Sequence, residues 1–459
     1  MADIGQLKVQ CFRGESAVPV DGCRITVTPT TNEQVANINQ QANNTNTPNN
    51  NQSVTNKTTN LITDSSGITP TVDLEAPPLE YSQEPTNNLP YSLYDVIVER
   101  EGFNQVSIRG VQVFPESTAL QQVNLEEQGN RASRAAIITI LPNTLNGNFP
   151  AKIPEDPDKP LPPPTSGVVL PKPVVPEFIT VHQGSPNDNS APNYRVGYKE
   201  YIKNVASCEI YSTWPESTIR ANIFCIISFT LNRIYTEWYR GKGKNFDITS
   251  STAYDHAFNY GRNIYDSISA VVDEIFSTYI RRIGRKQPLL TQYCDGKNVT
   301  CPQWLSQWGS KSLGDQGYVP YDILTYYYGN DIELTTAEQV SGSPSSYPGY
   351  DLTIGASGEP VSQTQDFLNR IAQNYPLIPR VAVDGVYGQS TAEAVRVFQG
   401  IFNLPQTGVV DYATWYQISN IYVGVTRIAE LRGDNVFYPP GNRKNNRSID
   451  IPNFSYPIY

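Results

Sequence analysis

A single glutamate, Glu209, stands at the junction of two helical patterns, in the stretch CEIYSTWPES. It is preceded by Cys208 and followed closely by Tyr211 and Trp214. A carboxyl group at a helix end among aromatic side chains can have its pKa raised by desolvation, which suits a general acid. The alternative is a solvated helix-end glutamate, because perturbed acids mark functional sites only statistically.

Two helices must position this acid. Tyr201, Ile202, Val205 and Cys208 follow helical spacing, which predicts an amphipathic helix that breaks near Ser212. A second helix is expected to begin at Pro215, where a missing N–H costs little. It is apolar almost all round, so it should be the central helix of a domain core.

Composition limits the class of protein. The chain has 459 residues, enough for two to four domains, and a net charge of −10. An acidic chain without a basic patch argues against nucleic acid as a partner. The N-terminus has no basic and apolar leader, and no apolar run reaches the ~18 residues of a membrane span. We therefore expect synthesis without a signal peptide and no membrane association.

Cysteine and histidine are too sparse for two common kinds of site. Six cysteines do not make a disulfide framework, and two histidines, His182 and His256, nearly exclude a zinc site built on several imidazoles. Cys208 and Cys225 lie in predicted core helices and are interpreted as buried apolar residues.

Patterns along the chain predict a multidomain protein. Short alternating segments predict an N-terminal all-β sandwich, with a mobile Asn-rich loop over residues 37–60. A mixed α+β region follows, and the C-terminal module has three helical patterns separated by glycine turns. The expected divisions are 1–128 (β-sandwich), 129–175 (Pro-rich linker), 176–336 (central domain), 337–358 (linker), 359–432 (three-helix module) and 433–459 (irregular tail).

The C-terminal module carries the most specific motif, VDGVYGQSTAEAVRVFQGIFNLPQTGVVDYATW. It resembles the three-helix peptidoglycan-binding domain of cell-wall hydrolases. The resemblance implies peptidoglycan as a partner. The residues of the motif taken as peptidoglycan-binding are Asp384, Gly385, Tyr387, Gly388, Gln399 and Trp415.

The central region then resembles the SpoIID family of sporulation lytic transglycosylases, through YIKNVASCEIYSTWPESTIRANIFCIISFTLNR, LSQWGS and YDILTYYYGNDIEL. The match puts Glu209 on the catalytic glutamate of that family. Asn222 and Ile227 depart from its pattern, and no histidine closely precedes Cys294. Some members bind zinc near this segment, but only Cys294 and Cys301 are available here, so metal, free thiols and a disulfide all stay open.

The order of the three parts resembles the SleC-type spore cortex-lytic enzymes of clostridia. That resemblance implies a zymogen deposited in the spore, made in the mother cell, and activated when a germination protease removes the N-terminal part. A lytic transglycosylase cleaves the bond between N-acetylmuramic acid and N-acetylglucosamine, and the substrate's own C6 hydroxyl attacks. One carboxylic acid can therefore serve first as acid and then as base.

The remaining site candidates are sugar contacts, namely Tyr211, Trp214, His256, Ser306 and Gln307. His256 has a plain alternative as an ordinary core or surface histidine. Two other functions stay open: a non-catalytic peptidoglycan-binding spore protein, and a muramidase that uses water in place of the C6 hydroxyl. No cofactor is expected, apart from the doubtful zinc.

Overall fold

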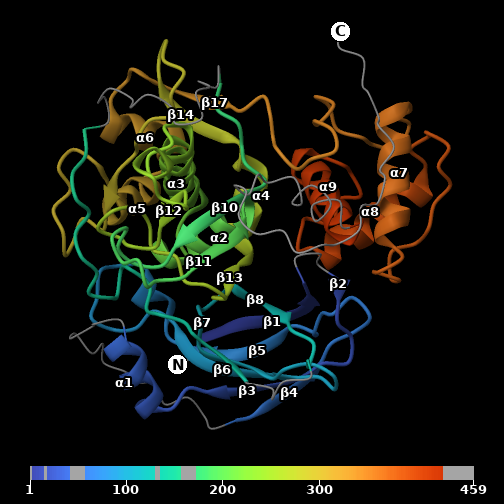
Figure 1. The fold of residues 1–459 in the computed structure, drawn as a ribbon, viewed down its shortest axis with the longest axis horizontal. Coiled ribbons are helices and arrows are strands. Elements are labelled where there is room, and N and C mark those ends of the chain that lie inside the picture. The colour runs from blue at the N-terminus through green and yellow to red at the C-terminus, as the bar shows by residue number, and fades with distance from the viewer. Residues whose placement is uncertain (1–2, 15–17, 42–56, 130–134, 157–171, 427–459) are drawn as a thin grey trace, which may run out of the picture.

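Alternating apolar residues near the N-terminus form two five-stranded sheets, which lie one above the other in Figure 1. In a computed structural model, residues 3–14, 18–41, 57–129, 135–156 and 172–426 are described. The sheet with order β13-β8-β1-β2, in which β5 also pairs with β1, comprises β1 (Asp3–Arg13), β2 (Val18–Pro19), β5 (Val72–Ala76), β8 (Thr118–Leu125) and β13 (Ile264–Tyr265). The sheet with order β4-β3-β6-β7-β9 comprises β3 (Arg24–Pro29), β4 (Thr59–Ile62), β6 (Ser92–Glu99), β7 (Val106–Val113) and β9 (Ala136–Thr139).

The expectation of an all-β N-terminal region is wrong at one place. Helix α1 (Asn32–Gln41) lies there, and it buries Val35 and Ile38. Its start is a capping box: the Thr31 hydroxyl accepts from the Gln34 amide, and the Gln34 side chain accepts from the Thr31 amide. The helix takes the first residues of the expected Asn-rich loop, and residues 42–56 lie outside the described residues.

The boundaries expected at residues 128 and 175 do not separate independent parts. Strand β9 lies in the expected linker and pairs in parallel with β7. Strand β13 belongs to the central region, yet it pairs with β8 of the N-terminal sheet. The expected Pro-rich linker is described at residues 129, 135–156 and 172–175, and the expected tail lies outside the described residues.

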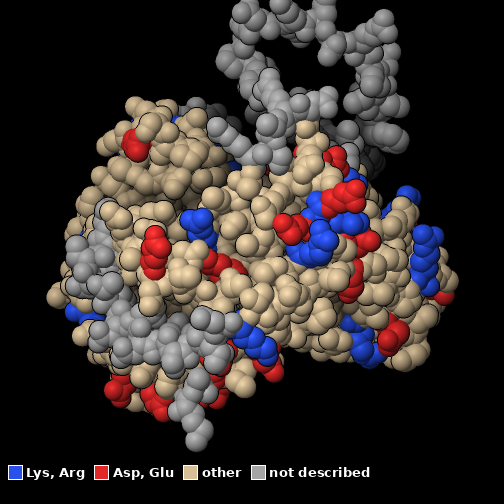
Figure 2. All heavy atoms as spheres, turned by 90° about the horizontal axis from the view of Figure 1, so that it is seen from below, with Lys and Arg blue, Asp and Glu red and all other residues tan. Residues whose placement is uncertain are grey.

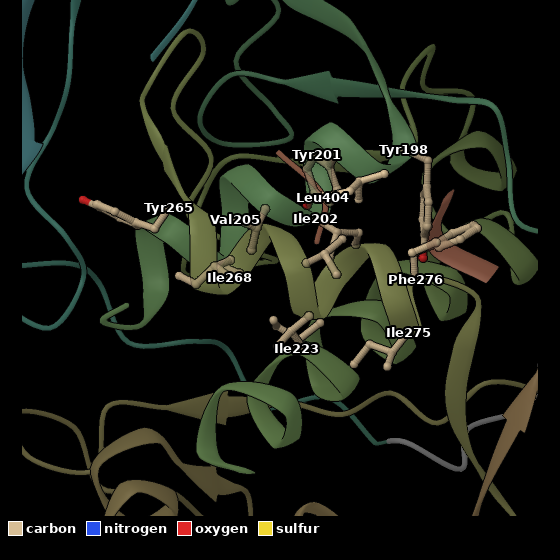
Figure 3. Packing of buried hydrophobic residues seen from close by; sticks show 14 of the residues in the cluster. Tyr198, Tyr201, Ile202, Val205, Ile223, Tyr265, Ile268, Ile275, Phe276 and Leu404 are labelled. Atoms are coloured by element: carbon tan, nitrogen blue, oxygen red, sulfur yellow. The ribbon is translucent and has the colours of Figure 1, made fainter. Parts of the chain in front are cut away.

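The central region is built around helix α3 (Glu216–Tyr235), which begins directly after Pro215, as predicted. Nearly every side chain of this helix is buried, and α2, α4, α5, α6 and β14 surround it. Figure 3 shows Ile202 and Val205 of α2 near Ile223 of α3 and Ile268 of α4. The other elements are α2 (Tyr198–Glu209), α4 (Asp266–Ile275), α5 (Gln307–Asp315), α6 (Pro320–Tyr328), β10 (Phe178–His182), β11 (Asn193–Gly197), β12 (Ile248–Thr249), β14 (Thr278–Arg282), β15 (Tyr293–Cys294), β16 (Leu305–Ser306) and β17 (Ile332–Thr336).

Three helices form the C-terminal region, α7 (Glu359–Ile371), α8 (Gln389–Ile401) and α9 (Tyr412–Thr426). Helix α9 also packs against α4 of the central region. At this contact the Lys199 ammonium donates to the Gln417 side chain at 2.7 Å, and Tyr412 and Ser277 share a hydrogen bond at 2.6 Å. Among the described helices, none has the length and hydropathy of a membrane span. Figure 2 shows acidic and basic side chains interspersed on the face in view.

Candidate active site and the peptidoglycan-binding domain

Glu209 is the last residue of α2, and its side chain is 4% exposed. Its carboxylate accepts three hydrogen bonds: from the Ala257 amide at 2.8 Å, the Thr144 hydroxyl at 3.0 Å and the Gln307 side-chain amide at 3.2 Å. The expected helix end and buried acid are therefore present. The donors come from three distant segments, which fix the direction of the carboxylate.

The carboxylate of Glu209 lines a cavity of about 620 Å³. Residues 144–152 form one wall, and the loop from Tyr293 to Val299 contributes another. Among the described residues of the wall, the other carboxylate is Asp295, which accepts from the amides of Asn298 and Val299 at 2.8 and 2.9 Å. Asp295 therefore closes its own turn, and Glu209 is the acid that several elements converge on.

Lys152 brings a positive charge to the same cavity. Its ammonium donates to the backbone carbonyl of Asp255 and lies 5.0 Å from the ring centre of Tyr293. Burial lowers the pKa of Lys152 to about 8, although the nearby charges of Glu209 and Asp255 act to raise it. Burial, and then the negative charge of Glu209, raise the pKa of Tyr293. The sequence interpretation missed Lys152, because it lies in the expected linker.

The segment that carries Lys152 is fastened to the central region on both sides of the cavity. Asn143 donates to the carbonyls of Ser207 and Ile210, at the end of α2. Further on, Glu155 forms an ion pair with Arg233, whose guanidinium also pairs with Asp255 at 2.7 Å. Residues 143–155 are thus a strap across the acid, and we call them the strap.

Tyr211 and Trp214 do not contact the cavity, contrary to the expectation of sugar contacts. Both are buried, and their rings pack with Phe114 of the N-terminal region and with Trp308. The Tyr211 hydroxyl donates to Asn146 of the strap, and the Trp214 indole donates to the Ser82 carbonyl at 2.9 Å. N-terminal residues and the strap therefore cover these two rings.

His256 and Ser306 are also placed away from the cavity wall. His256 is fully buried, and its Nδ1 shares a hydrogen bond with the Tyr201 hydroxyl at 3.1 Å. Burial and the charges of Lys152 and Arg233 hold the pKa of His256 well below its usual value. The Ser306 hydroxyl accepts from the Gly309 amide and caps α5. Of the five expected sugar contacts, only Gln307 reaches the cavity.

Cys294 and Cys301 form a disulfide. Cysteines joined to each other offer no thiolate to a metal, so these residues do not fit the zinc site of some SpoIID proteins. Within the described ranges, no group of three or more His, Cys, Asp or Glu side chains could hold a metal ion. The bridge closes the loop that forms one wall of the cavity.

The motif residues of the C-terminal region mostly face inward. Gln399 is fully buried, and its side chain bonds Thr407, Gly408, Val409 and Thr414. Tyr387 is 1% exposed and donates to the Gly408 carbonyl at 2.9 Å. Trp415 is buried and donates to the Ser345 carbonyl. These three side chains are buried and do not lie on the surface, as the expected contact with peptidoglycan would require: Gln399 and Tyr387 hold the second turn, and Trp415 bonds the segment that precedes α7.

The same construction occurs twice in this region. The side chain of Gln365 in α7 forms hydrogen bonds with Asp384, Gly385, Val386 and Thr391. The side chain of Gln399 in α8 forms the equivalent hydrogen bonds with the second turn. Gly385 and Gly408 both have positive φ, 70° and 69°, which favours glycine at the two turns. Gly388 precedes α8, and Asp384 accepts from the Val386 amide. The region is therefore an internal duplication that the sequence interpretation did not identify.

Comparison with known families identifies this region. Residues 357–418 match the family described as "Putative peptidoglycan binding domain". The chain therefore carries a C-terminal peptidoglycan-binding domain, as predicted, and it binds peptidoglycan through that domain. No curated protein matches the chain.

Among solved structures, the chain is similar to catechol 1,2-dioxygenase of Acinetobacter radioresistens, at 14% identity and a TM-score of 0.17. It is also similar to chlorocatechol 1,2-dioxygenase of Pseudomonas putida, at 12% identity and a TM-score of 0.14. In both cases 30% of this chain is matched, and it spans 58% of the dioxygenase chain. Similarity at this level carries no argument about function.

Proposed function

We propose that the central region is a lytic transglycosylase that cleaves the MurNAc–GlcNAc bond of spore cortex peptidoglycan and that this chain is its zymogen. The observation that carries the proposal is the buried Glu209 carboxylate, which opens on a cavity and is oriented by three donors. The wall-binding domain of the same chain supports peptidoglycan as the substrate. The SpoIID resemblance supports the reaction type, and the SleC-type domain order supports the spore cortex.

In the proposed reaction Glu209 protonates the leaving glycosidic oxygen. It then accepts the proton of the C6 hydroxyl as that oxygen attacks C1 and closes the 1,6-anhydro ring. Ordinary glycosidases use two carboxyl groups. Asp295 is bonded to the amides of its own turn, so the cavity suits a mechanism with one acid better than one with two. Asp295 is nevertheless a second carboxylate on the wall, which leaves the muramidase as the alternative.

The strap supports the zymogen part of the proposal. Thr144 occupies one oxygen of Glu209, and Lys152 places a cation in the cavity where a sugar would lie. The Thr144 hydroxyl donates to the Oε2 atom of Glu209, which also accepts from Gln307, so departure of the strap would remove one of the two donors at this oxygen. Proteolysis after the strap, followed by its departure, would free Glu209 and uncover Tyr211 and Trp214 for sugar contact.

The test compares Glu209→Gln with Glu216→Gln, in full-length protein trimmed by limited proteolysis. Glu216 is a matched control, because its exposed side chain only pairs with Arg220 on the surface of α3. We expect Glu209→Gln to release soluble fragments from decoated spores about 100-fold more slowly or worse, while binding to the wall is retained. Normal digestion by this variant would refute the assignment of the acid.

Mass spectrometry of the products then separates the alternatives. Anhydro-muropeptides, which lack one water relative to reducing ends, are expected. Reducing ends would indicate a muramidase. An absence of soluble fragments from the trimmed wild-type protein would favour the non-catalytic wall-binding protein.

A further inference from the structure

The motif side chains inside the two turns of the peptidoglycan-binding domain are buried and cannot reach a ligand. Gln365 and Gln399 are both at most 1% exposed, and their amide groups are used in holding the turns. Tyr387 and Trp415 are buried as well. The contact with peptidoglycan must therefore be made by residues other than these four.

The two duplicated turns differ in what they expose. In the first turn Val383 and Val386 are 52% and 54% exposed. The equivalent positions in the second turn, counted from the two glycines, are Gln406, which is exposed and polar, and Val409, which is half-buried. Exposed aliphatic side chains therefore gather on one turn of the pair, although the backbone hydrogen bonds of both turns are equivalent.

A third exposed aliphatic residue lies at the same end of the domain. Ile354 is 61% exposed, and the next residue, Gly355, donates its amide to the carbonyl of Tyr387 at 3.0 Å. Ser357 also forms a β-bridge with Val386. We call Ile354, Val383 and Val386 the turn face.

Within the part of the chain that the structure describes, the turn face is open. The N-terminal region contacts this domain through Lys8, which donates to Asn403 just beyond the C-terminal end of α8. The turn face lies at the other end of α8, about 20 Å away for a helix of 13 residues. Helix α9 is the element that packs against the central region.

We propose that the turn face is the surface on which the domain binds peptidoglycan. The polymer carries methyl groups on its acetamido and lactyl substituents and on the alanines of its stem peptides. Three half-exposed aliphatic side chains can bury such methyl groups, and the exposed Gln389 and Ser390 beside them offer hydrogen bonds to neighbouring polar groups. This inference rests on the wall-binding domain and does not need the central region to be an enzyme.

The first test is sedimentation of the full-length protein with purified peptidoglycan. The triple variant Ile354→Ser, Val383→Ser and Val386→Ser is expected to bind about tenfold more weakly. Leu377→Ser is the matched control, because Leu377 is 51% exposed in the same domain but follows the C-terminal end of α7. Unchanged binding of the triple variant, or an equal loss in the control, would overturn the proposal.

A second test measures the contact directly, so that binding by the central region cannot hide the result. The free cysteines of the described chain are all buried, so Val386→Cys can carry a thiol-directed photocrosslinker at one exposed position. We expect it to crosslink to peptidoglycan, and Leu377→Cys to give none. Repeating the experiment with glycan stripped of stem peptides separates acetamido and lactyl groups from alanine as the source of the methyl groups. Crosslinking at Leu377 alone would place the ligand elsewhere.

Discussion

The cavity around Glu209 and the peptidoglycan-binding domain use buried polar side chains in opposite ways. In the domain, the side-chain amide oxygen and nitrogen of Gln365 and Gln399 form hydrogen bonds with the turns of the same domain. In the cavity, Glu209 and Lys152 come from different parts of the chain, and both face an open space. The polar groups of the domain therefore bond within one local unit, whereas those of the cavity join segments that are distant in the sequence and also face a cavity.

This difference shows what a motif can report. The most specific motif in the sequence includes the buried residues that build two turns, and the proposed ligand surface lies on exposed side chains beside them. At the cavity, two residues of the segments that resemble the SpoIID family, Glu209 and Gln307, do line the open space.

The largest effect on stability is expected from Arg233→Met, in the network that fastens the strap. The change leaves the buried Asp255 without its cation and should lower the free energy of unfolding by about 3–5 kcal/mol. Urea unfolding measures it. Arg240→Met, which removes a partly exposed pair with Asp247, should cost about 1 kcal/mol or less. Equal losses would mean that the network stabilises no more than a surface pair.

Gln399→Leu should destabilise the peptidoglycan-binding domain by about 3 kcal/mol, because it leaves several buried turn groups without partners. Gln365→Leu should have a similar effect, as the equivalent residue of the duplication. Hydrogen exchange over residues 357–418 measures both. The exposed Gln373→Leu is the control and should change little. A large difference between the two buried glutamines would contradict their structural equivalence.

Lys152 should give stability a dependence on alkaline pH. Its pKa of about 8 in the folded protein lies below the 10.5 of the unfolded chain, so between these values the unfolded state binds more protons. The free energy of unfolding should therefore rise with pH across this window, by up to about 3 kcal/mol. Lys152→Met should lack this rise. The same dependence of the free energy of unfolding on pH in both proteins would show that burial does not lower the pKa of Lys152.

The smallest effect is expected at acid pH, from His256. Its pKa is lowered in the folded state, so below pH 6.5 the unfolded state binds a proton that the folded state does not. The free energy of unfolding should fall with decreasing pH, by at most about 1.4 kcal/mol per pH unit. His256→Leu should flatten that part of the curve. Comparing slopes in the two proteins removes the effect of altered packing.

Local patterns predicted the elements around Glu209 well. The spacing of apolar residues gives α2, the break and α3, because these helices are determined by their own sequence and by burial. The three helices of the C-terminal domain were predicted for the same reason. Helix α1 could have been predicted from its capping box, Thr31 and Gln34.

The composition of the cavity could not be predicted in the same way. Thr144 and Lys152 lie more than fifty residues before Glu209, in a proline-rich stretch whose composition indicates an extended linker. An extended segment takes its place from what it can pack against, and the side chains of Asn143 and Glu155 find partners in the folded central region. Pairings of this kind leave no periodic pattern in the sequence.

The contact between the tilted rings of Trp214 and Trp308 gives the protein an internal optical probe. The two indole rings lie 5.0 Å apart, and they are two of only five tryptophans in the chain. Trp214 is held by the Ser82 carbonyl of the N-terminal region. Departure of that region would bring water to the indole and move its fluorescence emission to longer wavelength. Release of the N-terminal region could therefore be followed in real time without a label.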